Sequence, residues 1–502
     1  MTIRQYPSSF VFYYSVITAL ILFSYFSFSY SYYPFFNADA ALAVLMSHDY
    51  HFPQDLYCWG QDRGGTLEMM IAHFFISLFH SSPLITSSVI HYILLVAGLI
   101  ASFHFVRKPF FRLALTVAWF FPSHFFIESV LYQFGVQFSL FMMGLCFFSK
   151  TMLAKKQKSL LLSLSFLFLF LNIWVLDLGI IPVFFLAFLI LLTAVIKSKN
   201  TELLPEGMPE LFSFKNLIIS ISWIVAGTSI IAYAKINAAH TAVYAETEIN
   251  DPDELLQTAT LVFKSILVSF HLLRKPTESF YFYSVLVFLI AFFFRARSAK
   301  EALTSANFFR QFFLWHSVFG ILLLMFSKQV LIADVPVRYF GGAYLSFVLF
   351  LLMKLETIEI RPVLSVSLSI VLAASIASSL YESYFPKKLA PMVNNFPVLN
   401  SLQPVGIIGS YWNSYVFSAI DPENIKATPH DQDNVRNRTL AYETLMQPRI
   451  LLIQNEWLEK FPDSISQFGT ALHKKGIPFL LGTYISWDEV NDVMACEYIK
   501  SQ

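Results

Sequence analysis

The stretch SLLLSLSFLFLFLNIWVLDLGIIPVFFLAFLILLTAVI, residues 159–196, contains a single charged side chain, that of Asp177. A helix that crosses a bilayer needs about 20 mostly apolar residues, so this stretch is long enough for two crossings, 159–176 and 179–196. The whole chain of 502 residues is 56% hydrophobic and only 13% charged, whereas a soluble domain is roughly 25% charged. The surplus of apolar side chains must face lipid, which excludes a soluble enzyme.

Similar apolar runs recur along the first 381 residues. The run 112–127 is the weakest of them because it contains Pro122 and His124. The first run follows Arg4 and ends in SFSYSYYPFF rather than at a small-residue cleavage site, so we expect an uncleaved first span. The sequence predicts about eleven spans, at 10–31, 84–106, 112–127, 133–149, 159–176, 179–196, 216–237, 279–294, 309–327, 339–354 and 363–381.

The charged residues sort by side of the membrane. With the N-terminus inside, the inner segments carry more than twice as many basic residues as the outer loops before residue 382. The positive-inside rule therefore favours the N-terminus inside and the C-terminus outside. Acidic residues concentrate in the outer loops, which directs the search for chemistry to that face. The total charge of +1 gives no case for a nucleic-acid partner.

The chain divides by composition into a transmembrane domain, 1–381, and an outer soluble α/β domain, 382–502. Two long outer segments, 32–83 and 238–278, contain the amphipathic pieces LEMMIAHFFISLFH and TLVFKSILVSFHLL, which we expect to lie as helices at the membrane interface and to form a lid. In the C-terminal region VGIIG, RILLIQ and IPFLLG predict strands, and ISQFGTALHKK predicts a helix.

The most informative outer stretch is FNADAALAVLMSHDYHFPQDLYCWGQDRGGTLEMMIAHFF, residues 36–75. Asp39 lies where the first span meets the outer surface, and an ionisable residue at such a position is a functional candidate by default. A structural interpretation is equally open, because Asp is a good N-cap for a helix that begins at Ala40. His124, Glu128 and Asp177 lie near other outer span ends and are weaker candidates for lining a cavity.

Several segments resemble bacterial membrane glycosyltransferases related to the protein O-mannosyltransferases, which have the GT-C fold. The sharpest is WGQDRGGTLE, 59–68. The others are FLNIWVLDLGIIPVFFLAFLILL (170–192), VPVRYFGGAYLSFVLFLL (335–352), GSYWNSYVFSAIDPENIKATP (409–429) and RNRTLAY (436–442). The resemblance implies a polytopic helical membrane protein with a small outer C-terminal domain. It also implies a polyprenyl-phosphate-linked sugar donor and transfer on the outer side of the membrane.

Carried over residue by residue, the resemblance assigns Asp39 as the general base on the acceptor hydroxyl. Many relatives have Asp-Glu where this chain has Asp39-Ala40, so either a neighbour such as Asp62 or Glu68 supplies the missing acid, or the enzyme is altered or inactive. Arg338 matches the family's Arg before a late Tyr, and a planar guanidinium suits the phosphate of the donor. The alternative for Arg338 is an interfacial side chain that snorkels.

Further binding candidates lie on the predicted outer face. Arg63 and Lys328 are candidate helpers of Arg338 at the donor phosphate. Trp59 is a candidate for stacking on a sugar ring or for an interfacial anchor. The full set of sugar or acceptor candidates is Trp59, Gln61, Asp62, Glu68 and Tyr339, and Gly64–Gly65 permits a sharp turn among them.

Cysteine and metal signals are weak. Cys58, Cys146 and Cys496 have no metal-ligand spacing, and free thiols are the default expectation. The DQD at Asp431–Asp433 resembles a metal-binding triplet of another glycosyltransferase fold, but such triplets are common in polar loops. The sequence therefore predicts no metal site and leaves an assisting divalent metal open.

The sequence thus favours an inner-membrane glycosyltransferase, a hexosyl- or pentosyltransferase that inverts by direct displacement, with a lipid, glycan or protein acceptor. A transporter or flippase of lipid-linked sugars is the alternative, and it should place ionisable residues near the midplanes of several spans. Here most charges lie in outer loops. A third interpretation makes the C-terminal domain a binding module with a membrane anchor, for which eleven spans are far more than is needed.

Overall fold

The computed structural model describes residues 8–29, 36–154, 156–197, 213–238, 248–295, 305–358, 362–384, 396–485 and 490–501. Two compact units divide the chain. The first, which we call the helical unit, comprises Met1–Phe26, Ile93–Ile230 and Tyr244–Phe385. The second, the mixed unit, comprises Ser27–Tyr92, Ile231–Val243 and Pro386–Gln502.

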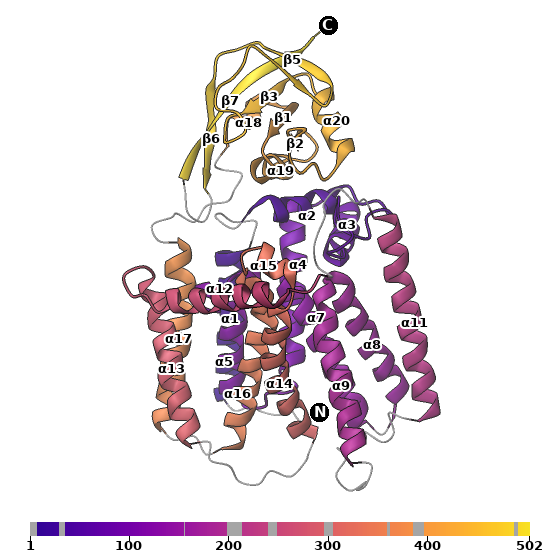
Figure 1. The fold of residues 1–502 in the computed structure, drawn as a ribbon, viewed down its shortest axis with the longest axis vertical. Helices are drawn as coiled ribbons and strands as arrows, with labels where there is room; N and C mark the ends of the chain where they lie inside the picture. Colours follow the sequence, from indigo (N-terminus) through magenta and orange to yellow (C-terminus); the bar gives the residue numbers. More distant parts are fainter. Residues whose placement is uncertain are drawn as a thin grey trace. The chain divides into compact units, whose positions relative to one another are not determined.

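A helix coincides with each of the predicted apolar runs, because a backbone in lipid must satisfy its own hydrogen bonds. Long helices run alongside one another in the helical unit, with α7 along α8, α13 along α17 and α14 along α16 (Figure 1). The long helices of the chain are α1 (Ser8–Phe28), α4 (Pro83–Ser102), α5 (Pro109–Phe120), α7 (Gln133–Leu153), α8 (Lys158–Val175), α9 (Ile180–Lys197), α11 (Phe214–Asn237), α13 (Pro276–Arg295), α14 (Ser305–Met325), α16 (Gly341–Thr357) and α17 (Pro362–Tyr384).

The weakest predicted span is broken. Helix α5 ends at Phe120, before Pro122, and the segment that follows, η1 (His124–Phe126) and α6 (Glu128–Leu131), is bent from it by 66°. A proline cannot donate the helical hydrogen bond, which explains a break at this position. By length and hydropathy, nine of the described helices suffice to cross a membrane, or ten with the bent pair, and α9 is outside that count. The number of spans and their orientation stay predictions.

Large apolar side chains on the long helices remain exposed. Phe184 is 67% exposed, Val195 71% and Phe294 78%. Such exposure is costly in water and favourable in lipid. The chain is therefore a multi-pass membrane protein.

The two units also contain two amphipathic helices and several short helices. Helix α3 (Leu67–Phe79) and helix α12 (Pro252–Ser269) form where the two interfacial pieces were predicted, and α12 runs across the long helices of its unit (Figure 1). Asp251 and Glu254 form a capping box at the start of α12. The remaining short elements are α2 (Ala38–His48), η2 (Asp177–Gly179), α15 (Lys328–Ile332), η4 (Val337–Phe340) and α18 (Leu399–Leu402).

The C-terminal region is α/β, as the sequence predicts. Its seven-stranded sheet has the order β2-β1-β3-β7-β5-β4, with β6 also paired to β7. Strands β1, β2 and β3 are parallel, and β3 to β7 is antiparallel. The elements are β1 (Val405–Gly409), α19 (Tyr411–Ile420), β2 (Ile425–Pro429), α20 (Arg438–Met446), β3 (Ile450–Ile453), β4 (Ser464–Gln467), β5 (Thr470–Lys474), β6 (Phe479–Ile485) and β7 (Val490–Lys500).

The helix predicted for ISQFGTALHKK is wrong. This segment forms the hairpin of β4 and β5, in which Gln467 pairs with Thr470. The two loop residues, Phe468 and Gly469, have φ angles of +50° and +75°, as a two-residue hairpin turn of the mirror-image type requires. The local turn geometry and the pairing of β5 with β7 therefore override the apparent helical pattern.

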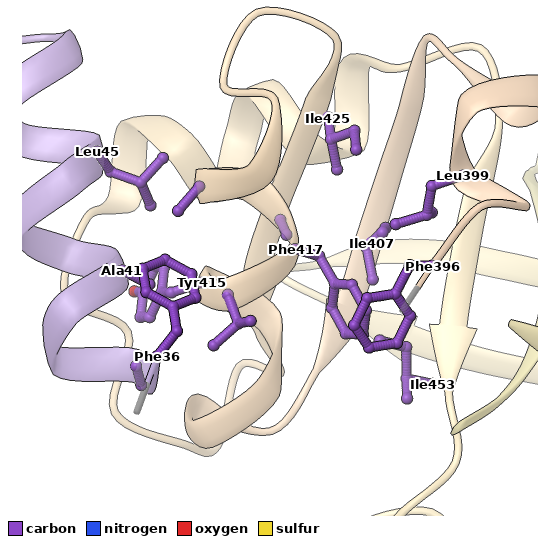
Figure 2. Packing of buried hydrophobic residues seen from close by; sticks show 14 of the residues in the cluster. Phe36, Ala41, Leu45, Phe396, Leu399, Ile407, Tyr415, Phe417, Ile425 and Ile453 are labelled. Atoms are coloured by element: carbon purple, nitrogen blue, oxygen red, sulfur yellow. The ribbon is translucent and has the colours of Figure 1, made fainter. Parts of the chain in front are cut away.

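Helix α2 belongs to the hydrophobic core of the mixed unit. Its buried side chains, among them Ala41 and Leu45, pack in one cluster with Tyr415, Phe417 and Ile407 of the C-terminal region (Figure 2). Helix α19 is the neighbour of α2 in this packing. The short helix that carries Asp39 is thus seated on the α/β fold by apolar contacts.

Candidate functional site

The helical unit contains a pocket with an empty volume of about 450 Å³, including its open mouth. Its walls are mostly apolar and come from four parts of the unit, namely α7, the η2–α9 segment, α14 and the η4–α16 segment. The polar members are Gln137, His316, Arg338 and Tyr339. The apolar members are Phe134, Phe138, Leu178, Ile181, Pro182, Gly320, Leu324, Gly342 and Ala343.

Arg338 lines this pocket from η4, which begins after Pro336. Its Nη1 atom lies 3.9 Å from Oε1 of Glu128, and both side chains are 31% exposed. The guanidinium also lies 5.7 Å from the ring of Tyr132 and 6.0 Å from that of Tyr339. These contacts hold the guanidinium between a carboxylate and two aromatic rings, while its planar group of five N–H donors borders the pocket.

Two buried polar pairs face the apolar lining. Gln137 donates a hydrogen bond to Oδ1 of Asn172, and Nδ1 of His316 lies 2.8 Å from Oγ of Ser346. All four residues are buried, and His316 is 4% exposed. Polar groups buried this deeply need partners, so each pair holds one pocket-lining side chain in place.

Lys328 does not line the pocket. Its Nζ lies 3.1 Å from Oε1 of Glu254 and 3.5 Å from Oε2 of Glu248. The hydrogen bond and charge of Glu254 raise the pKa of Lys328. Asn250 binds the carbonyls of Met325 and Ser327 next to this cluster, so Lys328 ties the start of α12 to the end of α14.

Asp39 lies in the first turn of α2, in the mixed unit, and is exposed. The N-cap interpretation of Asp39 is wrong, because α2 begins at Ala38 and the side chain of Asn37 accepts the hydrogen bond from Ala40 N. Oδ1 of Asp39 instead accepts a hydrogen bond of 2.8 Å from the hydroxyl of Tyr411, the first residue of α19. Burial and the charge of Asp39 raise the pKa of Tyr411, so the phenol remains a donor.

The loop before α3 holds the most specific motif. Its turn places Gly60 and Gly64 at φ angles of +71° and +70°, values that favour glycine. The indole of Trp59 donates to Oδ1 of Asp55, while its ring packs against the core of the mixed unit. Burial raises the pKa of Asp55. Trp59 therefore has a structural role in this loop, and sugar stacking by it stays a prediction.

The other candidates of this loop differ in exposure. Nε of Arg63 donates to Oε1 of Gln61 at 3.4 Å, and Gln61, Asp62 and Arg63 are all half-buried. Glu68 is 7% exposed, and its Oε2 lies 3.1 Å from Nδ1 of His91 on α4. Glu68 thus makes a buried pair with a histidine that the sequence did not single out.

The DQD triplet of the C-terminal domain binds backbone groups. Oδ2 of Asp431 accepts from Phe468 N, and Oδ2 of Asp433 accepts from Tyr411 N at 2.7 Å. In the described part of the chain, no group of three or more His, Cys, Asp or Glu side chains is placed to hold a metal ion. Cys58, Cys146 and Cys496 are free thiols, as expected.

Some residues that contact Asp39 or line the pocket were not among the candidates predicted from the sequence. Tyr411 and Arg436, whose guanidinium lies 5.5 Å from the Tyr411 ring, are in segments that carried the family resemblance, but nothing local to Tyr411 signals its hydrogen bond to Asp39. His316 and Gln137 occur within apolar runs, where a buried polar residue is itself a signal for a cavity.

Two solved structures are similar to this chain. The ArnT protein from Cupriavidus metallidurans, solved bound to undecaprenyl phosphate, matches with a TM-score of 0.53 at 7% identity over 97% of each chain. The oligosaccharyltransferase AglB from Archaeoglobus fulgidus, solved with an inhibitory peptide and a dolichol-phosphate, matches with a TM-score of 0.40 at 10% identity over 88% of this chain and 69% of that chain.

The match to ArnT extends over nearly the full length of both chains, so this chain has the GT-C fold. No protein-family model and no curated protein sequence matches the chain. The fold expected from WGQDRGGTLE and the later segments is confirmed.

Proposed function

We propose that this chain is a membrane glycosyltransferase that moves a sugar from a polyprenyl-phosphate-linked donor to an acceptor hydroxyl on the outer face of the inner membrane. The observation that carries the proposal is the arginine of the pocket. Arg338 lines a mostly apolar pocket between long apolar helices. A polyprenyl phosphate has the matching chemistry, an anionic head on an apolar chain. The similar fold of ArnT, which was solved with undecaprenyl phosphate, supports the same ligand class.

In the proposed reaction, Asp39 takes the proton of the acceptor hydroxyl. The acceptor oxygen bonds to the anomeric carbon as the bond from that carbon to the phosphate oxygen breaks, and the electron pair stays on the phosphate. Arg338 stabilises the charge that develops on the departing lipid phosphate, and such stabilisation is commonly the largest catalytic contribution. Arg63 remains a candidate helper, and the acceptor is a lipid, a glycan or a protein.

The phosphate assignment is tested first by binding. Purified full-length chain is titrated with undecaprenyl phosphate, and the dissociation constant is compared with that of Arg338→Gln. We expect weaker binding by about 10–100-fold, because a hydrogen bond to a charged group is lost. Arg274→Gln, at an exposed arginine outside the pocket, should bind as the unchanged chain does. Equal binding by Arg338→Gln would remove the basis of the proposal.

The reaction is tested by transfer. Vesicles that contain the chain as their sole protein receive lipid extracts with radiolabelled polyprenyl-phosphate sugars and a set of candidate acceptors. Asp39→Asn keeps the size of the side chain but cannot accept the proton, so transfer should fall by about 10²–10⁴-fold. Full activity of this variant contradicts the base assignment. Movement of labelled lipid across the vesicle membrane without transfer would instead favour a flippase.

A further inference from the structure

The side chain of Asp39 is fixed by the C-terminal domain. Among the residues that the structure describes, the hydroxyl of Tyr411 is the hydrogen-bond partner of Oδ1, at 2.8 Å. Oδ2 is then the oxygen that remains for an acceptor hydroxyl. An exposed aspartate without such a contact samples several rotamers, whereas a general base must stay within hydrogen-bond reach of its proton.

The phenol that makes this contact is itself held firmly. Tyr411 is 6% exposed, and its ring makes an edge contact with Tyr415 at 5.7 Å between centroids. Its backbone N–H donates to Asp433 at 2.7 Å. The guanidinium of Arg436 lies 5.5 Å from its ring. A side chain restrained on several sides transmits its position to the carboxylate that it binds.

The two partners also share one hydrophobic core. Buried side chains of α2, including Ala38 and Ala41, lie in the same cluster as Tyr411 and Tyr415 of α19. Helix α2 and helix α19 therefore move as one body, which keeps the hydrogen bond intact without a cost in ordering either helix.

We propose that Tyr411 is a positioning residue, which holds the carboxylate of Asp39 in the orientation from which it accepts the proton and so makes the C-terminal domain part of the catalytic apparatus. This inference rests on the proposed function. Because the phenol keeps its own proton, Tyr411 acts through Asp39 and takes no part in proton transfer itself.

The test compares Tyr411→Phe with Tyr415→Phe in the vesicle transfer assay. Tyr415 lies one turn further along α19, and its hydroxyl accepts from Arg436 N rather than binding Asp39. At saturating labelled donor, Tyr411→Phe should lower the transfer rate by about 10–100-fold, because one hydrogen bond to a charged group is lost. The dissociation constant of the Tyr411→Phe variant for undecaprenyl phosphate should not change. Tyr415→Phe should keep the transfer rate.

A double variant separates positioning from a merely structural role. If Tyr411 acts through Asp39, Asp39→Asn with Tyr411→Phe is no slower than Asp39→Asn alone. A further loss in the double variant, or a full rate in Tyr411→Phe, overturns the inference. Incorporation of 4-aminophenylalanine at 411 keeps the ring and a donor, so it should restore most of the rate. This second variant decides the matter if the Phe chain does not fold.

The outcomes also separate this inference from the function on which it rests. Full activity of Asp39→Asn contradicts the assignment of the base, whatever Tyr411 does. An inactive Asp39→Asn combined with a fully active Tyr411→Phe contradicts the positioning role alone.

Discussion

Nη1 of Arg338 lies 3.9 Å from Oε1 of Glu128, so the guanidinium that we propose for a lipid phosphate already faces a carboxylate. The pair is partly exposed, and pairs of this kind contribute little to stability. Glu128 therefore competes with a lipid phosphate for Arg338, because its carboxylate repels an anion that approaches the guanidinium. The same pair also orients the guanidinium when the pocket holds no phosphate.

Glu128→Gln should therefore bind undecaprenyl phosphate more tightly by about twofold to fivefold, the scale of a partly exposed ion pair. Titration of the purified chain measures the change. Glu356→Gln is the control, since Glu356 accepts hydrogen bonds from the backbone of Arg107 and Lys108 and does not line the pocket. Weaker binding by Glu128→Gln would show that Glu128 assists the ligand instead of competing with it.

The ion pairs of Lys328 predict a structural effect. Lys328→Ala should raise amide hydrogen exchange in α12 by about twofold to fivefold, because the partly exposed contacts to Glu254 and Glu248 are lost. Lys328→Arg keeps the positive charge beside Glu254 and Glu248 and should leave exchange in α12 near the starting value. A loss of undecaprenyl phosphate binding in Lys328→Ala, with exchange in α12 unchanged, would instead favour Lys328 as a phosphate ligand.

The close packing of α4 against α7 predicts that an alanine at Gly98 destabilises the chain more than an alanine at Gly320. A Cβ at Gly98 would lie 2.3 Å from Cβ of Ser139, whereas a Cβ at Gly320 would lie 3.6 Å from Cβ of Ala343. Gly98→Ala should lower the free energy of unfolding by about 1–3 kcal/mol through overpacking. Gly320→Ala should be neutral or stabilising, because its contact is an ordinary one. Thermal unfolding in detergent measures both, and equal midpoints would contradict the close approach of α4 and α7.

The histidine at the end of α2 predicts a pH dependence. Burial and the charge of Lys426 lower the pKa of His48 from its ordinary value of 6.5. The unfolded chain thus binds a proton at His48 more readily than the folded chain does. The stability that neutral His48 contributes is therefore fully present above pH 6.5 and is lost as the pH falls through the pKa of His48 in the folded chain. His48→Gln cannot titrate and should show a smaller fall of the unfolding midpoint on acidification. An unchanged pH slope in this variant would contradict the shift.

The shared core predicts that a residue far from the sheet in sequence supports the C-terminal domain. Leu45 is 4% exposed within that core. Leu45→Ala should destabilise the mixed unit by about 2–5 kcal/mol, the usual range for a buried leucine. Leu78→Ala on α3 is the matched control, since Leu78 is 57% exposed. Protease resistance of the C-terminal domain during denaturant titration separates the two variants, and equal resistance would argue against the shared core.

The membrane helices were predictable because lipid imposes one simple rule on the chain. A helix formed at each apolar run, and the break near Pro122 fell in the run judged weakest. The turn at Phe468–Gly469 was missed because a single glycine is a weak hairpin signal and the pairing partner β7 comes later in the chain. The hydrogen bond from Tyr411 to Asp39 had no local signal at all, since 372 residues separate the two.

The packing of α2 against the α/β domain has a consequence for synthesis. Helix α2 leaves the ribosome early, whereas its core partners on α19 follow 372 residues later, counted from Asp39 to Tyr411. At about 5–20 residues per second, α2 waits on the order of 20–70 s before the surface that completes it exists. A ribosome that stops before the sheet is made leaves a chain without Tyr411, so the carboxylate of Asp39 lacks its hydrogen-bond partner. The transfer that we propose for Asp39 therefore depends on completion of the last domain, and truncated chains should transfer more slowly than the full chain.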